Sequence, residues 1–477
     1  MAKVPGRVWV SVAVCLIVAV PVGALIAPGL ADASASGGDP GVSGALSTVA
    51  ATLKLGNGEG SHGGSPFYAV VLTDDGTPVR SLVALGAYLN STPFTWIRFG
   101  GDGAAYDPTT STNYVPPPSG NGTYLAVHTL LWNLQWFRSW CYSTTPHCSW
   151  LGYLPGEENN TQAAVHTAEW YHNVLHFVPT YWEFGNEPNA WTHFGKNLTR
   201  WSTSDRSAPT GAGYATMVHD YMAAVHAVFP SDRFIGIEAS CACNSALVSD
   251  TVAMDGAGLS GVAYHSYPTQ AGSTTTLTKF YGLLASLSNL THTVAQFRGN
   301  VAGACRTCRA LPIELGEYQA GPFYAFSPLA ATYAGAPFIV GSVIEAIGAN
   351  VSQFTVFDSN SLFDLATGRP TFEGLAYQRI LENLTMGTDT SVQVKASGTS
   401  GVWALLTANG TKRSLLIVNT NTATSLTVSI PPGVFATGGP GSYWQWAATG
   451  LVPTARTTTA LPSSYSVSAQ GILLLTV

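Results

Sequence analysis

Charged residues are scarce in this chain. Lysine, arginine, aspartate and glutamate together make up 10% of its 477 residues, against about 25% in an average soluble domain. The 20 basic and 26 acidic residues leave a formal net charge of −6. The sequence therefore lacks the basic footprint by which proteins bind nucleic acid, and we expect no nucleic-acid partner. Polar uncharged residues must form most of the surface, which would then change charge little in acid.

Long apolar runs are also missing, with one exception at the N-terminus. Lys3 and Arg7 precede an almost wholly apolar run from Val8 to Ile26, and small residues follow it. This pattern predicts an export signal over residues 1–35. Because the run is long, an uncleaved membrane anchor is the alternative, and it is the only membrane contact that we expect. Either way, we predict a secreted or cell-surface protein, with a Ser/Gly-rich linker over residues 36–47.

Cysteine is limited to seven residues, one of which lies in the export segment. In an oxidising compartment the other six predict disulfides, although their connectivity stays open. Two of the close pairs have the spacing C-x-C and C-x-x-C, so they could bridge to each other or bind zinc. We favour disulfides and predict no metal and no cofactor. The six cysteines are Cys141, Cys148, Cys241, Cys243, Cys305 and Cys308.

Glycosylation sequons are frequent, and each predicts a surface position if the host adds glycans. They begin at Asn90, Asn121, Asn159, Asn197, Asn289, Asn350, Asn383 and Asn409.

Strand-like and helix-like segments alternate over residues 48–386. This alternation predicts parallel βαβ units and an α/β fold, a (β/α)8 TIM barrel. From residue 387 to 477, short Val/Leu/Thr-rich runs between turn residues predict an all-β sandwich domain. The longest expected helix is 276–299. The expected barrel strands are 48–55, 94–99, 149–154, the first part of 181–189, 233–239, 262–265, 311–316 and 353–357.

The stretch Tyr181–Asn189 carries the strongest sign of chemistry. It begins as an apolar, aromatic strand and ends in Gly-Asn-Glu-Pro, where Pro188 stops strand pairing. Glu187 thus lies at the C-terminal end of a buried parallel strand, where a βα barrel places its catalytic groups. Period-two geometry puts Glu183 on the same side as Glu187, but deeper.

A second carboxylate, Glu317, follows the expected strand 311–316. If both strands belong to one barrel, Glu187 and Glu317 face each other across its rim. Two carboxylates about 5–5.5 Å apart are what retaining glycoside hydrolysis requires, one as acid/base and one as nucleophile. Glu314 has the opposite parity in a regular strand and is the weaker candidate.

Several segments resemble known glycoside hydrolases. Trp182–Pro188 resembles the acid/base segment of clan A, whose fourth barrel strand ends in Asn-Glu-Pro. More narrowly, the chain is similar to family 79, the heparanases and β-glucuronidases, over most of residues 48–477. The matching segments are Trp96–Gly101, Trp182–Asn189, His265–Tyr267, Leu315–Glu317 and Leu415–Asn419.

The resemblance implies a role for each site residue. Glu187 becomes the general acid/base and Glu317 the nucleophile, and Asn186 would bind the sugar 2-hydroxyl. Arg98 would lie beneath Glu317, although pairing with Glu183 or Glu238 is an alternative for a buried arginine.

His265 and Tyr267 would orient the nucleophile, with a core histidine as the alternative for His265. Gly321 and Tyr324 are the candidates for holding a sugar 6-carboxylate, and Trp191 for stacking on a sugar ring. Trp191, like Trp182 and Trp201, is equally well suited to a core position.

These residues predict an exported retaining β-glycosidase that acts on an oligo- or polysaccharide or a simple glycoside. A β-glucuronidase is one form of this prediction. The Gln319-Ala-Gly-Pro322 run is less rich in glycine and serine than heparanase, which puts a glucuronic acid preference in doubt. A glycosidase for neutral sugars and a non-catalytic glycan-binding protein are the alternatives.

Overall fold

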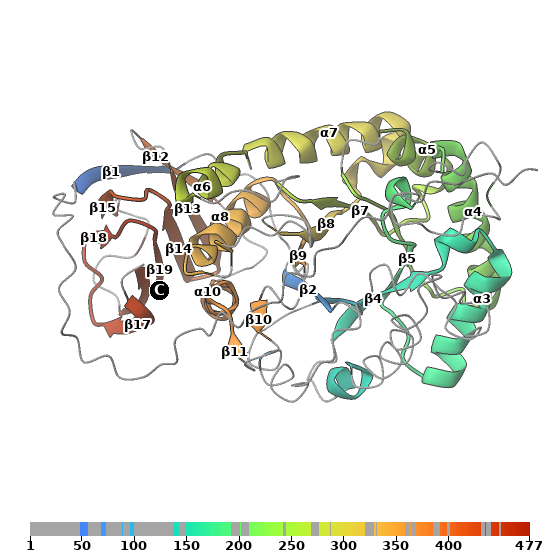
Figure 1. The fold of residues 1–477 in the computed structure, drawn as a ribbon, viewed down its shortest axis with the longest axis horizontal. Coiled ribbons are helices and arrows are strands. Elements are labelled where there is room, and N and C mark those ends of the chain that lie inside the picture. The colour runs from blue at the N-terminus through green and yellow to red at the C-terminus, as the bar shows by residue number, and fades with distance from the viewer. Residues whose placement is uncertain are drawn as a thin grey trace, which may run out of the picture. The chain divides into compact units, whose positions relative to one another are not determined.

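Two large sheets organise the chain in the computed structural model (Figure 1). One contains eight strands and the other nine, and a two-stranded ladder joins β10 (Phe363–Asp364) to β11 (Arg369–Pro370). Residues 1–47 lie outside the described part, so the export segment and linker stay predictions. The structure describes residues 48–55, 68–72, 88, 96–99, 137–142, 148–191, 201, 209–241, 245–268, 276–286, 288–319, 329–330, 332–357, 362–364, 369–384, 392–397, 401–430, 435, 440–447 and 450–477.

All neighbouring strands of the eight-stranded sheet run parallel, in the order β5-β4-β3-β2-β9-β8-β7-β6. The edge strands β5 and β6 meet at one parallel bridge between Trp182 and Phe234. There the Trp182 N–H donates to the Arg233 carbonyl oxygen at 2.8 Å. The strands are β2 (Tyr68–Leu72), β3 (Trp96–Phe99), β4 (Ser149–Leu154), β5 (Tyr181–Phe184), β6 (Ile235–Ala239), β7 (Gly261–Ser266), β8 (Ile313–Tyr318) and β9 (Gln353–Val356).

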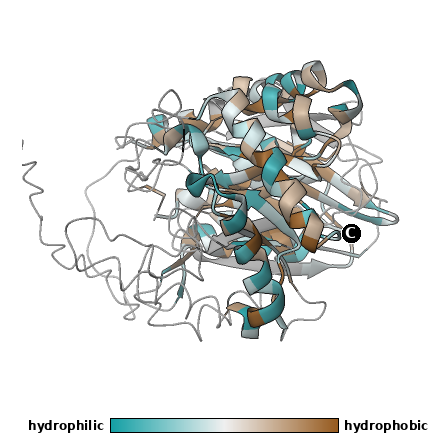
Figure 2. Ribbon diagram, turned by 90° about the vertical axis from the view of Figure 1, so that its right-hand side faces the viewer, coloured by the Kyte–Doolittle hydropathy of each residue, from teal (hydrophilic) through white to brown (hydrophobic). Residues whose placement is uncertain are grey.

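Helices alternate with these strands, as Figure 1 shows for α3, α4, α5 and α7. Two of the helices begin where a threonine side chain accepts a backbone N–H, Thr210 from Gly213 and Thr371 from Gly374. Helix α8 is buried on almost all sides because it is apolar almost all round. Figure 2 shows that the helices carry both hydrophobic and hydrophilic residues. The α-helices are α3 (Thr161–Glu169), α4 (Gly211–Val228), α5 (Ser245–Asp255), α6 (Leu277–Ser286), α7 (Ser288–Ala304), α8 (Gly335–Gly348) and α10 (Phe372–Asn383), with a π-helix η2 at Trp170–Leu175.

The nine-stranded sheet folds back over itself. Its order is β17-β16-β19-β14-β13-β12-β1-β15-β18, yet Leu426 and Val467 at one end share an apolar core with Ile417 and Leu473 from the far half. Side chains so far apart in strand order meet only if the sheet forms two layers. The strands are β1 (Thr48–Leu55), β12 (Val392–Ser397), β13 (Val402–Asn409), β14 (Lys412–Asn419), β15 (Ser425–Ser429), β16 (Gly441–Ala447), β17 (Gly450–Thr458), β18 (Ser464–Val467) and β19 (Gly471–Thr476).

The assignment of residues 48–55 to the barrel was wrong. This strand, β1, pairs antiparallel with β12 and parallel with β15, so it belongs to the nine-stranded sheet. The parallel sheet instead begins at β2, which pairs with β3 and β9. A strand pattern gives the local conformation but not the partner, which here lies more than 300 residues away along the chain. The helix expected over 276–299 is divided between α6 and α7.

The cysteine pairs close locally. Cys141 bonds to Cys148 and Cys305 to Cys308, each with a Cα–Cα distance of 5.2 Å. Cross-pairing of Cys305 and Cys308 with the C-x-C pair was one open possibility and zinc binding another, and the Cys305–Cys308 disulfide contradicts both. Cys241 is also disulfide-bonded, and Cys243 lies outside the described residues.

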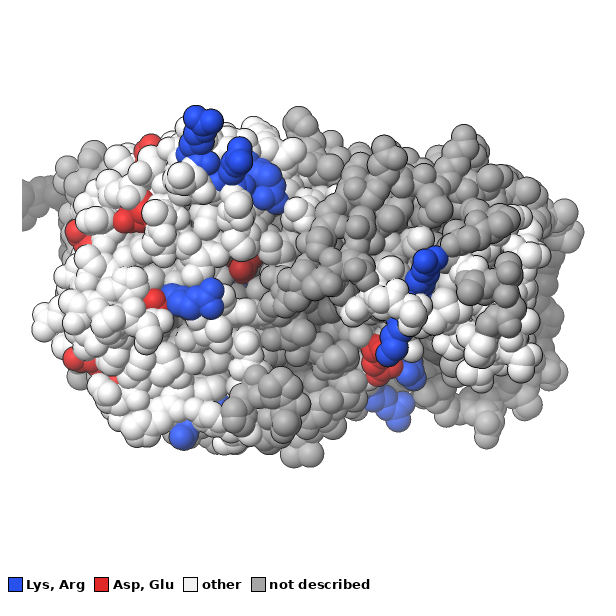
Figure 3. Space-filling model, turned by 180° about the vertical axis from the view of Figure 1, so that it is seen from behind, with Lys and Arg blue, Asp and Glu red and all other residues white. Residues whose placement is uncertain are grey.

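Charged groups are few among the described residues of the face drawn in Figure 3, in keeping with the low charged content of the sequence. No helix among the residues that the structure describes is long and apolar enough to span a bilayer.

Candidate active site

A polar layer lies above an apolar floor on the inner face of the parallel sheet. Trp96, Leu151, Tyr181, Ile235 and Ala263, from five strands, pack together as that floor. Successive side chains of a strand alternate between its faces. The residues two positions further along three of these strands therefore enter the next layer: Arg98, Glu183 and His265.

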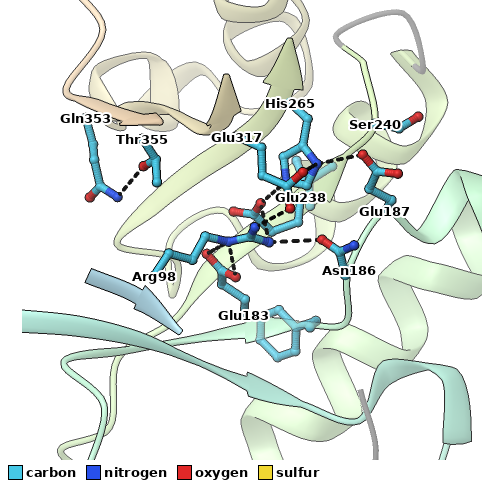
Figure 4. A network of polar contacts seen from close by, with 12 residues as sticks. Arg98, Glu183, Asn186, Glu187, Glu238, Ser240, His265, Glu317, Gln353 and Thr355 are labelled. Atoms are coloured by element: carbon cyan, nitrogen blue, oxygen red, sulfur yellow. Dashed lines mark hydrogen bonds and ion pairs between the residues drawn. The ribbon is translucent and has the colours of Figure 1, made fainter. Parts of the chain in front are cut away.

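Arg98 is the centre of this layer (Figure 4). It is fully buried, and its Nε lies 3.0 Å from Glu183 Oε2. Its Nη1 lies 2.5 Å from Glu317 Oε1, while Nη2 donates to Asn186 Oδ1 at 3.0 Å and lies 3.2 Å from Glu238 Oε2. Burial alone would lower the pKa of Arg98, but the surrounding carboxylates, Glu183 first, raise it well above its usual value. Arg98 thus contacts the expected nucleophile and pairs with both alternative partners at once.

His265 joins the two expected catalytic carboxylates. Its Nδ1 lies 2.7 Å from Glu187 Oε1 and 3.2 Å from Glu317 Oε2, and its Nε2 lies 2.7 Å from Glu238 Oε2. Burial lowers the pKa of His265, but the charge of Glu317 and the hydrogen bonds to Glu187 and Glu238 outweigh it and raise the pKa to about 10. The ring is therefore an imidazolium at neutral pH, with both N–H groups donating to carboxylates. We expected His265 to orient Glu317, but its shorter contact is with Glu187.

The carboxylates of Glu187 and Glu317 meet at this layer. An oxygen of each lies within 4.8 Å of the other and of a His265 ring nitrogen. The Tyr267 hydroxyl donates to Glu317 Oε2, while Arg98 holds the other oxygen. The two carboxylates thus face one space, at a separation close to the roughly 5–5.5 Å of retaining glycosidases.

A β-bulge in β8 aims Glu317 at the site. In the pairing of β7 with β8, Ala263 lies opposite Glu314 and His265 opposite Glu317, so Gly316 is the extra residue. Ala263 and His265 share one face of β7, and Glu314 and Glu317 consequently share one face of β8. The opposite parity expected for the two glutamates is wrong, because it assumed a regular strand. Glu314 lies deeper, and burial raises its pKa to about 8.

Gly316 also leaves room for the Glu238 carboxylate. A Cβ built at this position would lie 2.3 Å from Glu238 Oε2. A side chain at position 316 would therefore displace the carboxylate that His265 and Arg98 both contact.

The backbone is strained where β5 and β6 reach this layer. Glu187 has φ 48° and Glu238 has φ 41°, and β-branched Ile237 has φ 93°, a conformation that is unusual for residues other than glycine. The pairing of β6 with β7 shifts register between Gly236 and Ala239. Such strain persists only when surrounding contacts fix it, and it is common at functional sites. Here the Glu187 N–H donates to the Glu238 carbonyl oxygen at 3.1 Å.

Glu183 and Glu238 are two buried carboxyl groups that share the Arg98 guanidinium beneath the site. Burial raises the pKa of Glu183 well above its usual range, and Arg98 only partly offsets this. Burial acts on Glu238 as well, but Arg98 and His265 outweigh it and lower the pKa of Glu238 to about 2. The two carboxyl groups thus shift in opposite directions although both contact Arg98. Our sequence reasoning treated Glu238 only as a partner of Arg98, although its place at a strand end was the signal used for Glu187.

Trp191 does not line the site. It is fully buried, and its indole N–H donates to the Asn186 carbonyl oxygen at 2.6 Å. Trp182 and Trp201 are buried as well, so the core alternative holds for all three tryptophans. Gly321 and Tyr324 lie outside the described residues.

Among the described residues, the side chains of Glu187, His265 and Glu317 lie close enough together to hold a metal ion. The residues present do not fit one well. A cation there would share Glu317 with the Arg98 guanidinium, and the imidazolium of His265 offers no lone pair.

Known proteins resemble this chain in structure. No family model and no curated protein sequence matches it. A family 51 α-L-arabinofuranosidase from Bifidobacterium longum superposes with a TM-score of 0.66 and 12% identity, over 90% of this chain and all of that one. A bifunctional glucanase-xylanase, CelM2, from a metagenome library gives 0.60 and a family 44 xyloglucanase from Paenibacillus polymyxa gives 0.59, each with 12% identity over 90% of this chain and 99% of the other. At such identities the similarity concerns the fold, and the chain therefore has the fold of these glycoside hydrolases.

Proposed function

We propose that this chain is a retaining glycosidase, with Glu187 as the general acid/base and Glu317 as the nucleophile. The observation that carries the proposal is the approach of their carboxylate oxygens to within 4.8 Å. Inverting enzymes hold their two carboxyl groups about 6.5–9.5 Å apart to admit a water molecule, and the approach of these two oxygens favours the retaining mechanism instead.

The surrounding contacts suit a double displacement. Arg98 and Tyr267 each hold one oxygen of Glu317, which fixes the carboxylate for attack on the anomeric carbon. Glu187 gives a proton to the leaving oxygen as that bond breaks, and a glycosyl ester forms on Glu317. Glu187 then takes a proton from the water that hydrolyses the ester.

A neutral sugar suits this layer better than a glucuronic acid. Four carboxyl groups contact Arg98 or His265 in it, from Glu183, Glu187, Glu238 and Glu317. Among the described residues, the arginine of the layer is already engaged by four partners. The His265 imidazolium is likewise held by Glu187 and Glu238, so an added 6-carboxylate would meet like charge there. The structural neighbours include an α-L-arabinofuranosidase, an endoxylanase and a xyloglucanase, which agrees with a neutral substrate.

The proposal includes the features that fit this function. We propose that the substrates are β-linked and that the parallel sheet closes into a complete (β/α)8 barrel. We also propose that the protein is exported from the cytoplasm and carries glycans. Membership of family 79, with glucuronide hydrolysis, is the narrower form of the proposal.

A panel of aryl glycosides tests it directly. Purified protein is assayed on aryl β-xylosides, β-glucosides, β-galactosides, α-L-arabinofuranosides and β-glucuronides, with a Glu317→Ala preparation as the control for contaminating activity. We expect hydrolysis of a neutral glycoside, and NMR of the first product should show the anomeric configuration of the substrate. A first product of inverted configuration, or equal rates for the Glu317→Ala control, would exclude the mechanism. Preferred cleavage of the glucuronide would move the assignment to the family 79 form.

A further inference from the structure

We infer that His265 stores the proton that Glu187 uses as general acid, and that Glu238 is the positioning residue that keeps the proton there. The inference deepens the proposed function and depends on it for the role of Glu187. It starts from a short chain of contacts, because His265 bridges Glu187 Oε1 and Glu238 Oε2 at 2.7 Å on each side.

Burial isolates the contacts between Glu187, His265 and Glu238 from solvent. His265 and Glu238 are each 1% exposed, and Glu187 is 8% exposed at the mouth of the site. A proton on Nδ1 therefore faces Glu187 and, at 3.2 Å, Glu317. Glu187 is the nearer acceptor and the one that needs a proton for departure of the leaving group.

Glu238 has the features of a proton-holding partner. It accepts the Nε2–H, which fixes the ring orientation and leaves Nδ1 toward the catalytic carboxylates. The other titratable and charged groups around His265 are Glu187 and Glu183 from the β5 segment, Arg98 from β3, Glu317 from β8 and Tyr267 after β7. Arg98 opposes the imidazolium and the carboxylates favour it, and the pKa of about 10 gives the sum of these effects.

The proton balance closes over one catalytic cycle. The Nδ1–H bond breaks as a proton passes to Glu187, which leaves His265 neutral with its Nε2–H still on Glu238. Glu187 then loses this proton to the leaving oxygen as the bond from that oxygen to the anomeric carbon breaks. In the second step Glu187 removes a proton from water as the water attacks the anomeric carbon, and the proton returns to Nδ1. No other reactant is needed.

The pH profile of Glu238→Gln tests the inference. Glutamine keeps the size of the side chain and can accept the Nε2–H, but it removes the charge that favours the imidazolium. We expect the alkaline limb of kcat/KM to move to lower pH by about one unit or more, with about a tenfold loss at alkaline pH and a smaller loss on the acid side. Glu314→Gln is the matched control, because it removes another buried carboxyl of the inner face that has no hydrogen bond to His265 among the described contacts. If Glu238→Gln fails to fold, Glu238→Asp keeps the charge with a longer contact and should give a smaller shift in the same direction.

NMR of nitrogen-15 histidine separates this inference from the proposed function. The His265 signals, assigned with a His265→Gln variant, should show both ring nitrogens protonated at about pH 8 in the native protein. Titration at lower pH in Glu238→Gln, but not in Glu314→Gln, supports the inference even if no glycoside is cleaved. A neutral His265 at that pH, or an unchanged titration and alkaline limb in Glu238→Gln, overturns it even if the protein is an active glycosidase.

Discussion

Replacement of Arg98 by methionine should be among the most destabilising changes in this chain. Arg98 is fully buried beside Glu183, Glu238 and Glu317. Removal of one partner from a buried ion pair costs about 3–5 kcal/mol, because the remaining charge loses its compensation. Glu238 gives an independent figure, since its pKa falls from 4.5 to about 2 largely through Arg98, a difference of about 3 kcal/mol. We therefore expect Arg98→Met to lose about 3–5 kcal/mol at pH 7.

The loss of stability in Arg98→Met should become smaller as the pH falls. A carboxyl with a lowered folded-state pKa contributes stability above its unfolded value, and this contribution disappears as the pH falls through the folded value. For Glu238 the window runs from about pH 4.5 down to about pH 2. Without Arg98 most of this contribution is gone at every pH, so the gap between the native protein and the variant should narrow between pH 7 and pH 3.

Urea titrations followed by tryptophan fluorescence, at pH 7, 5 and 3, measure this difference. Arg379→Met is the matched control, because Arg379 pairs with Glu382 at 2.8 Å with side chains 49% and 26% exposed. Such a surface pair contributes about 0–1 kcal/mol. An Arg98→Met loss as small as that of the control, or a gap that does not change with pH, would refute the reasoning.

Four further outcomes follow from the site. Glu317→Ala should abolish hydrolysis of all glycosides, and azide should restore part of the rate on an activated substrate, as initial-rate assays would show. Glu187→Ala should slow poor leaving groups by about 10²–10⁴-fold and activated ones much less, which a leaving-group series measures. Glu314→Gln should raise stability at pH 7–8 but not at pH 4, because an acid with its pKa raised to about 8 loses its folded-state contribution as pH rises from 4.5 through that value; thermal melts at both pH values check this. Trp191→Phe removes the hydrogen bond to the Asn186 carbonyl and should cost about 0.5–1.5 kcal/mol in the same melts.

The main elements of the site could be predicted because they follow local rules. Alternating strands and helices predicted the parallel sheet, and carboxylates at strand ends pointed to Glu187 and Glu317. The resemblance to glycoside hydrolases added Arg98, His265 and Tyr267, and the structure brings all five residues into one layer. Neither the alternation nor the motifs required knowledge of a distant contact.

Each wrong prediction depended on contacts that the pattern of a single strand does not reveal. The strand at 48–55 was recognised, but its partners in β12 and β15 follow from the folding of the whole sheet. Glu314 was placed on the wrong face because one extra residue in β8 reverses the parity after it. Trp191 was a candidate for sugar stacking because an indole suits a core and a binding site equally well.

Charged residues are scarce in this chain, and the positions of the buried ones matter for the site. Among the described residues, nine acidic side chains are buried and Arg98 is the buried arginine. Five of the nine lie on the inner face of this sheet: Glu183, Glu187, Glu238 and Glu317 in the polar layer, and Glu314 deeper. Arg98 and His265 together cannot neutralise five acidic groups. Buried acids in excess of their cations keep protons instead, and the raised pKa values of Glu183 and Glu314 show this. The inner face of this sheet is therefore a place where protons are held at neutral pH, which is what a general acid requires.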